Sequence, residues 1–120
     1  METQQVLTIA KDALEDKKAQ DITVLDVRKF SNITDFMIVA TGRTARQVSA
    51  LAQHVIAQIK THGQRPLGDE GTKYGEWALV DLGDVMVHVM QPETREFYQL
   101  EKLWGEMGNQ DSMNSSQQTT

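Results

Sequence analysis

Residues 76–90 constrain the fold most, because they read as two strands joined by a tight turn. Both flanks, 77–80 and 85–90, are rich in β-branched, aromatic and aliphatic residues, which favour strands. The Gly83-Asp84 step between them is typical of a turn that closes a hairpin. The chain is therefore expected to contain an antiparallel pair of strands.

The second strand of this hairpin is apolar on both faces. Alternation places its three valines, at 85, 87 and 89, on one face and Met86, His88 and Met90 on the other. The valine face suits a core covered by helices. Two interpretations of the Met-His-Met face stay open: another part of the chain covers it, as in most internal strands, or it is a docking surface, since methionine adapts to irregular partners.

Hydrophobic spacing predicts the remaining elements. Residues 6–14 and 45–59 keep the three- and four-residue spacing of amphipathic helices, and a last helix is expected from Pro92 to about residue 104. Residues 22–27 read as a strand, and 36–41 as a central, buried strand. This order predicts a single α/β domain with a small mixed sheet flanked by helices, because crossovers and a hairpin cannot share a purely parallel sheet.

Local signals also set the boundaries. Thr44 and Gln47 form the pattern of a capping box, and His62-Gly63 is expected to end that helix. Residues 64–75 carry three glycines and a proline, and they predict one extended loop. Residues 106–120 contain too little apolar material to fold, so the sequence predicts a domain over 1–105 and a disordered polar tail over 106–120.

Composition narrows the function classes. Twelve basic and seventeen acidic residues give a formal charge of −5, which opposes broad contact with phosphate backbones and makes DNA an unexpected partner. The 120 residues include no cysteine, which excludes disulfides and thiolate chemistry. No run approaches the length of a membrane span and no signal peptide is recognisable, so the expected location is the cytoplasm.

Catalytic patterns are weak. The chain's three histidines, His54, His62 and His88, lack compact metal-ligand spacing, and Thr41-Gly42-Arg43-Thr44 lacks the features of a nucleotide-binding loop. Asp81 and Asp84 are expected to shape the hairpin turn. Trp77 heads the hairpin beside the predicted loop and is a candidate anchor for a partner. The residues alone predict a non-enzymatic binding domain without cofactor or metal.

Three segments carry a more specific signal: Ser31 to Gly42, Glu76 to Met90 and Arg95 to Trp104. In this order and with these separations, they resemble the ribosomal silencing factor family, also called the Iojap-related family. The resemblance extends from about Val6 to Trp104. It implies a nucleotidyltransferase-like fold without that activity, and the chain indeed lacks the Gly-Ser motif and the paired aspartates that such enzymes use.

The resemblance also implies a function. Members of this family bind large-subunit ribosomal protein fourteen and sterically block joining of the small subunit when nutrients are scarce, and an acidic domain suits such a basic partner. The family motif falls here on Asp69-Glu70-Gly71, Trp77, Asp81, Gly83, His88 and Met90, and on Arg95, Tyr98, Glu101 and Trp104. The resulting hypothesis is an apolar docking patch of Trp77, Met86, His88 and Met90 with an acidic rim of Asp69, Glu70 and Asp81.

Two other classes of function remain as alternatives. An active enzyme of the nucleotidyltransferase type would need a pair of carboxylates on one strand beside a Gly-Ser turn. A homodimeric interaction module would pair the Met86/His88/Met90 face with its own copy, and light scattering would detect it.

Overall fold

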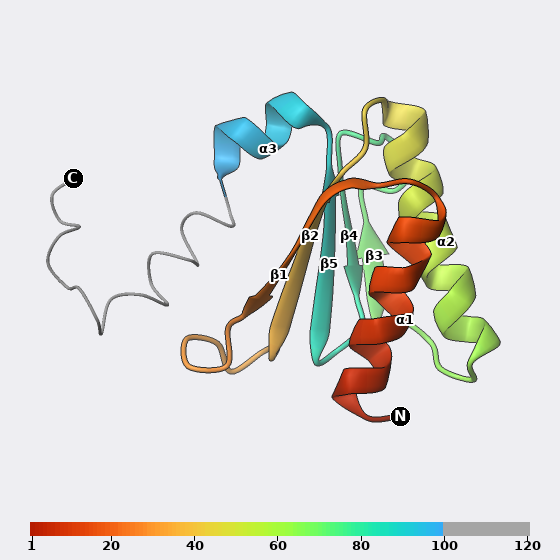
Figure 1. Cartoon of the computed structure of the whole chain (residues 1–120), viewed down its shortest axis with the longest axis vertical. Helices are drawn as coiled ribbons and strands as arrows, with labels where there is room; N and C mark the ends of the chain where they lie inside the picture. Colours follow the sequence, from red (N-terminus) through yellow and green to blue (C-terminus); the bar gives the residue numbers. More distant parts are fainter. Residues whose placement is uncertain (100–120) are drawn as a thin grey trace, which may run out of the picture.

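The computed structural model describes residues 1–99, which form a five-stranded sheet with three helices (Figure 1). The strands are β1 (Gln20–Asp26), β2 (Phe36–Thr41), β3 (Gly68–Glu70), β4 (Trp77–Asp81) and β5 (Val85–Met90). The helices are α1 (Thr3–Asp16), α2 (Ala45–Thr61) and α3 (Pro92–Tyr98). The predicted tail, 106–120, and the end of the predicted last helix lie outside the described residues.

The sheet is mixed, as predicted. Its order is β1-β2-β5-β4-β3, with β2 and β5 parallel and the other neighbours antiparallel. The predicted hairpin is the β4–β5 pair, and the positive φ of Gly83, 87°, makes the tight turn between them. The α/β class with a small mixed sheet is therefore confirmed.

One face of the sheet packs against α1 and α2, which lie side by side over it (Figure 1). The three valines of β5 point into this layer and are completely buried, together with Leu14 of α1 and Leu51 of α2. Burying a side chain of this size contributes about 1.5–3 kcal/mol. This layer fixes the sheet, so that its other face and its ends are presented in a defined geometry.

The start of α2 is capped, though not by the box that the sequence predicts. The Thr44 hydroxyl accepts a hydrogen bond from the backbone N–H of Gln47 at 3.0 Å, as expected. The Gln47 side-chain oxygen accepts from the backbone N–H of Arg43 at 2.7 Å rather than from that of Thr44. The reciprocal bond therefore closes one residue before the cap, and α2 ends ahead of His62 and Gly63, as predicted.

The prediction of one extended loop over 64–75 is wrong. Residues 68–70 form the edge strand β3, which pairs with β4, and the backbone N–H of Leu67 donates to the carbonyl oxygen of Asp81 at 2.8 Å. All three residues of β3 are exposed, and none of them is apolar apart from Gly68, so the segment has no apolar alternation that would reveal a strand. The remaining turn packs against α2, since a side chain at Gly75 would overlap the carbonyl oxygen of Ala45.

One end of the sheet gathers several elements and is here called the α3 end; it is the upper end in Figure 1. The last residues of β2 and β5 meet there, with the backbone N–H of Gly42 donating to Met90 at 3.0 Å. The backbone N–H of Gln91 donates to the carbonyl oxygen of Glu76 at 3.2 Å, which joins the start of α3 to the start of β4. The N-terminus of α2 lies at this end as well.

Candidate partner-binding site

The register of the hairpin brings five of the predicted site residues onto one face of the sheet. Trp77 is paired with Met90, and Asp81 with Met86, so these side chains share a face with His88. This face is the one opposite α1 and α2. The five residues are therefore brought together by strand alternation and by the length of the turn between β4 and β5.

The five residues differ sharply in exposure. Met90 is completely buried and His88 is 8% exposed, whereas Trp77, Asp81 and Met86 are half-buried. Met90 packs with Val39 beneath Trp77 and offers no atom to a partner in this structure. Of the two interpretations of the Met-His-Met face, the first therefore applies to Met90 and to most of His88, because other parts of the chain cover them. Met86 is the accessible residue of the three.

Trp77 and His88 form a polar contact within this face. The Trp77 Nε1–H donates to His88 Nδ1 at 3.0 Å, with the ring centroids 5.8 Å apart. An indole only donates, so Nδ1 must be the unprotonated nitrogen of a neutral imidazole. Burial lowers the pKa of His88 from 6.5 to about 4. His88 is therefore neutral at physiological pH and positions the Trp77 ring.

Two aromatic residues of α3 extend this cluster. The Tyr98 ring lies 4.6 Å from that of Trp77, and the Phe97 ring meets Tyr98 edge-on at 4.9 Å. Both side chains are largely open to solvent, since Phe97 is 78% exposed and Tyr98 is 51% exposed. Within the described residues α3 ends at Tyr98, where the following Gln99 adopts a positive φ of 50°, and none of its residues is buried.

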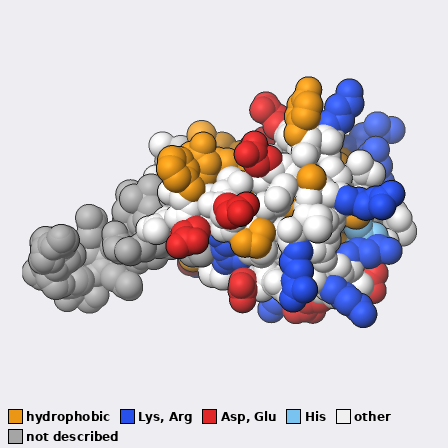
Figure 2. Space-filling view, turned by 90° about the horizontal axis from the view of Figure 1, so that it is seen from above, with side chains coloured by type: hydrophobic (Ala, Val, Ile, Leu, Met, Phe, Trp, Pro, Cys, Tyr) orange, Lys and Arg blue, Asp and Glu red, His pale blue; other side chains and the backbone are white. Residues whose placement is uncertain are grey.

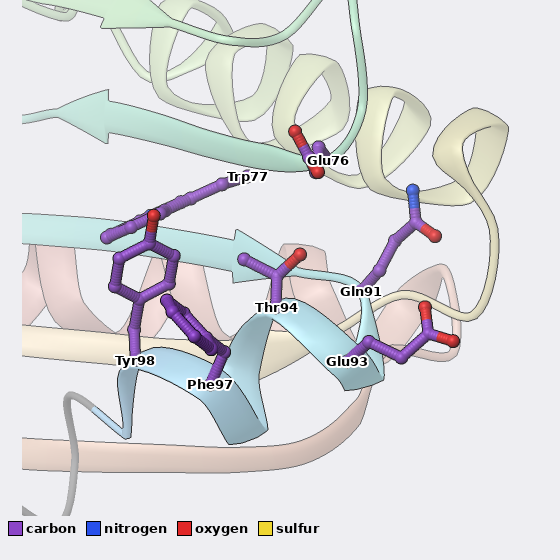
Figure 3. A pocket seen from close by; sticks show the side chains of 7 residues that line it. All are labelled: Glu76, Trp77, Gln91, Glu93, Thr94, Phe97 and Tyr98. Atoms are coloured by element: carbon purple, nitrogen blue, oxygen red, sulfur yellow. The ribbon is translucent and has the colours of Figure 1, made fainter.

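These rings border a hollow of about 430 Å³ at the α3 end (Figure 3). Its lining joins three aromatic rings to two carboxylates and two neutral polar residues: Trp77, Phe97, Tyr98, Glu76, Glu93, Gln91 and Thr94. The Gln91 side chain donates to the carbonyl oxygen of Gly75 at 2.9 Å, which fixes one wall. Aromatic faces beside carboxylates favour an apolar stem with a cationic head, as in lysine or arginine.

Arg95 fastens α3 over the sheet. Its guanidinium donates to the carbonyl oxygen of Asp21 at 2.7 Å, to the Thr41 hydroxyl at 2.8 Å and to the Thr23 hydroxyl at 3.2 Å. These acceptors belong to β1 and β2. The hollow is therefore bounded by an element that tertiary hydrogen bonds hold in place, since α3 is only two turns long.

The predicted acidic rim is divided between two faces. Glu70 is paired with Leu79 and lies on the Trp77 face, whereas Asp69 is paired with Val80 and lies on the face of α1 and α2. Asp81 is engaged in the hairpin turn, where its Oδ1 accepts from the backbone N–H of Gly83 at 2.9 Å. The carboxylates that line the hollow are Glu76 and Glu93, neither of which the sequence singled out.

The other candidate residues have structural contacts. His54 Nε2 lies 3.0 Å from Asp16, and His62 Nδ1 lies 2.9 Å from the carbonyl oxygen of Gln58. Within residues 1–99, no group of three or more His, Asp or Glu residues is placed to hold a metal ion. None of the helices in that same range has the length and hydrophobicity that a membrane span requires.

A family model matches the whole chain, and known proteins resemble most of it. A model of the family described as "Ribosomal silencing factor during starvation" matches residues 1–120. A Chromobacterium violaceum protein named ribosomal silencing factor RsfS is 50% identical over 105 residues, covering 88% of this chain and 86% of that protein. A Haemophilus influenzae protein of the same name is 48% identical over 93 residues, covering 78% and 91%.

A more distant relative and a solved structure are also similar to this chain. The mouse protein named mitochondrial assembly of ribosomal large subunit protein 1 is 33% identical over 94 residues, which cover 76% of this chain and 41% of that protein. A crystal structure of a Chromobacterium violaceum protein superposes with a TM-score of 0.85 at 50% identity and covers 88% of both chains.

Proposed function

This chain belongs to the ribosomal silencing factor family, and from that membership we propose that it represses translation by binding the large ribosomal subunit. The bound protein sterically prevents the small subunit from joining when nutrients are limiting. Its contact on the large subunit is ribosomal protein fourteen. The repressor acts by occupying a surface and needs no cofactor and no catalytic step.

The family match over the full chain is the observation that carries this proposal. The name of the mouse relative, which refers to the large ribosomal subunit, supports the choice of subunit. The acidic character of the domain supports a basic protein as the partner, since complementary charge raises association rates and suppresses wrong partners.

We assign docking to the Trp77 face, with its centre at the α3 end, where Trp77 is paired with Met90; Met86 and Asp81 are paired at the other end of the hairpin and mark the margin of this surface. Trp77 and Met86 supply half-buried apolar surface, and His88 and Met90 support the Trp77 ring from below. Glu70 and Asp81 are the acidic residues on this face. Asp69 belongs to the same edge strand as Glu70 but lies on the opposite face of the sheet. The exposed rings of α3 extend the apolar surface beyond the patch that the sequence predicts.

The hollow gives this surface a central pocket. A lysine or arginine side chain of the partner would lay its stem on the Tyr98 and Phe97 rings and direct its charge to Glu76 or Glu93 (Figure 3). Desolvated aromatic anchors of this kind carry most of the affinity of an interface. Phe97 is therefore the side chain whose removal tests the site with the least effect on folding.

Sedimentation of purified subunits tests the proposal. Wild-type protein should comigrate with the large subunit and lower the fraction of joined ribosomes. Phe97→Ala should weaken both effects by roughly tenfold or more, as for a hot-spot aromatic residue. Ile33→Ala is the matched control, since Ile33 is 77% exposed against 78% for Phe97 but lies in the loop between β1 and β2, at the opposite end of the sheet.

The outcomes separate function from site. Wild-type protein that binds neither subunit would refute the repressor assignment. If the Phe97 and Ile33 variants block subunit joining equally well, the proposed function stands but the docking surface does not include α3. Light scattering addresses self-association, because a homodimer formed through this face should dissociate on Phe97→Ala and not on Ile33→Ala.

A further inference from the structure

A cluster of exposed cations lies beside the docking surface. It comprises Lys17 and Lys18 at the end of α1, Arg43 and Arg46 around the start of α2, and Lys73 in the turn before β4, and it is called here the cationic patch. Figure 2 looks onto this end of the molecule. Lys and Arg side chains spread over the half away from α3, whereas hydrophobic and acidic side chains gather toward α3.

Contacts among three segments hold the patch together. The Gln47 side chain donates to the carbonyl oxygen of Lys18 at 3.4 Å, which ties the end of α1 to the first turn of α2. The Ser49 hydroxyl donates to the carbonyl oxygen of Thr72, which seats the turn bearing Lys73 against the same helix. The five cations thus come from separate parts of the sequence and converge on one surface.

The charges of the patch are not neutralised within the fold, although Arg43 donates to the side-chain oxygen of Gln20 at 2.7 and 3.0 Å. Across residues 1–99, no carboxylate forms an ion pair with any of the five side chains. The first turn of α2 contains no acidic residue and instead carries Arg46, although the positive end of a helix favours anions. Like charges gathered on one surface repel one another, so the arrangement favours a polyanionic ligand.

Resting on the proposed function, we infer that the cationic patch contacts the phosphate backbone of ribosomal RNA next to the protein on which the domain docks. A ribosomal subunit places RNA beside its proteins, and the turn bearing Lys73 leads directly into Glu76 and Trp77 of the docking surface. Although the whole chain has a formal charge of −5, acidic and basic side chains occupy different parts of its surface. The acidic aromatic part would bind protein and the basic part would bind RNA.

The salt dependence of binding tests this inference. The patch variant combines Arg43→Gln, Arg46→Gln and Lys73→Gln, and leaves Lys18, whose φ is 64°, unchanged. Its affinity for purified large subunits should fall roughly tenfold to a hundredfold at low salt, and the slope of log K against log salt should decrease by about 2 to 3 for three lost phosphate contacts.

A matched control removes the same charge elsewhere. The control variant combines Lys11→Gln, Lys60→Gln and Arg65→Gln, three exposed cations outside the patch, and it should bind as the wild type does. Circular dichroism establishes that both variants are folded. A fluorescently labelled short RNA duplex serves as a second probe, and at low salt it should bind the wild type and the control but not the patch variant.

Each outcome has a distinct meaning. Equal affinities and equal salt slopes for the patch and control variants on large subunits would overturn the inference. Weaker subunit binding by the patch variant, with unchanged duplex binding, would assign the patch to an acidic protein surface and overturn the RNA contact. Wild-type protein that binds the duplex through the patch but binds no subunit would refute the proposed function and leave the RNA contact standing.

Discussion

Acidification should destabilise the domain through His88. The pKa of this residue is about 4 in the folded protein and 6.5 when unperturbed, because burial opposes the charged form. Between these values the unfolded chain binds the proton more readily, so stability is complete above 6.5 and falls as the pH drops toward 4. At about 1.4 kcal/mol per pKa unit, lowering the pH from 7 to 5 should remove about 2 kcal/mol from the free energy of unfolding.

Urea unfolding at the two pH values measures this loss. His88→Asn is the matched variant, because its Oδ1 takes the position of His88 Nδ1 and can accept the Trp77 N–H now bonded at 3.0 Å but does not titrate in this range. The variant should lose about 2 kcal/mol less than the wild type over the same pH interval. An equal loss in both proteins, or an NMR titration that gives His88 an unshifted pKa, would refute the reasoning.

Three further substitutions test the scaffold around the site. Gly75→Ala should lower the free energy of unfolding by about 2 kcal/mol or more in urea unfolding, because the new side chain would overlap α2. Gly63→Ala is the control, since Gly63 also has a positive φ but faces open space, and it should cost about 1 kcal/mol. Arg95→Lys should accelerate amide hydrogen exchange in α3 but not in α2, because lysine cannot span the three acceptors that Arg95 joins, and unchanged exchange would exclude this fastening role. Thr44→Ala should cost about 1 kcal/mol of stability in thermal unfolding, and Thr44→Ser, which keeps the hydroxyl, should recover most of it.

Sequence reasoning succeeds where the signal is local. The β4–β5 hairpin and α2 follow from alternation, helical spacing and turn residues, and each lies within two residues of its predicted bounds. The same alternation places Met86, His88 and Met90 on one face. Because these features depend on neighbours in the chain, no knowledge of tertiary packing is needed to predict them.

Sequence reasoning fails where contacts between residues distant in the chain determine the structure. The edge strand β3 exists because β4 offers it a backbone partner, and its exposed side chains leave no pattern. Alternation assigns Met90 to a face but does not reveal that the face covers it completely. The contribution of Phe97 to the hollow depends on how Arg95 places α3, which no local signal encodes.

The position of β5 in the sheet has a consequence for folding during synthesis. Its neighbours are β2 on one side and β4 on the other, yet the whole of α2, β3 and β4 separates β2 from β5 in the chain. A nascent chain that stops before Val85 therefore lacks the middle strand and leaves an edge of β2 unpaired. Cooperative folding of this domain must wait until the last strand has emerged, and amino-terminal fragments that end earlier are expected to be prone to proteolysis and aggregation.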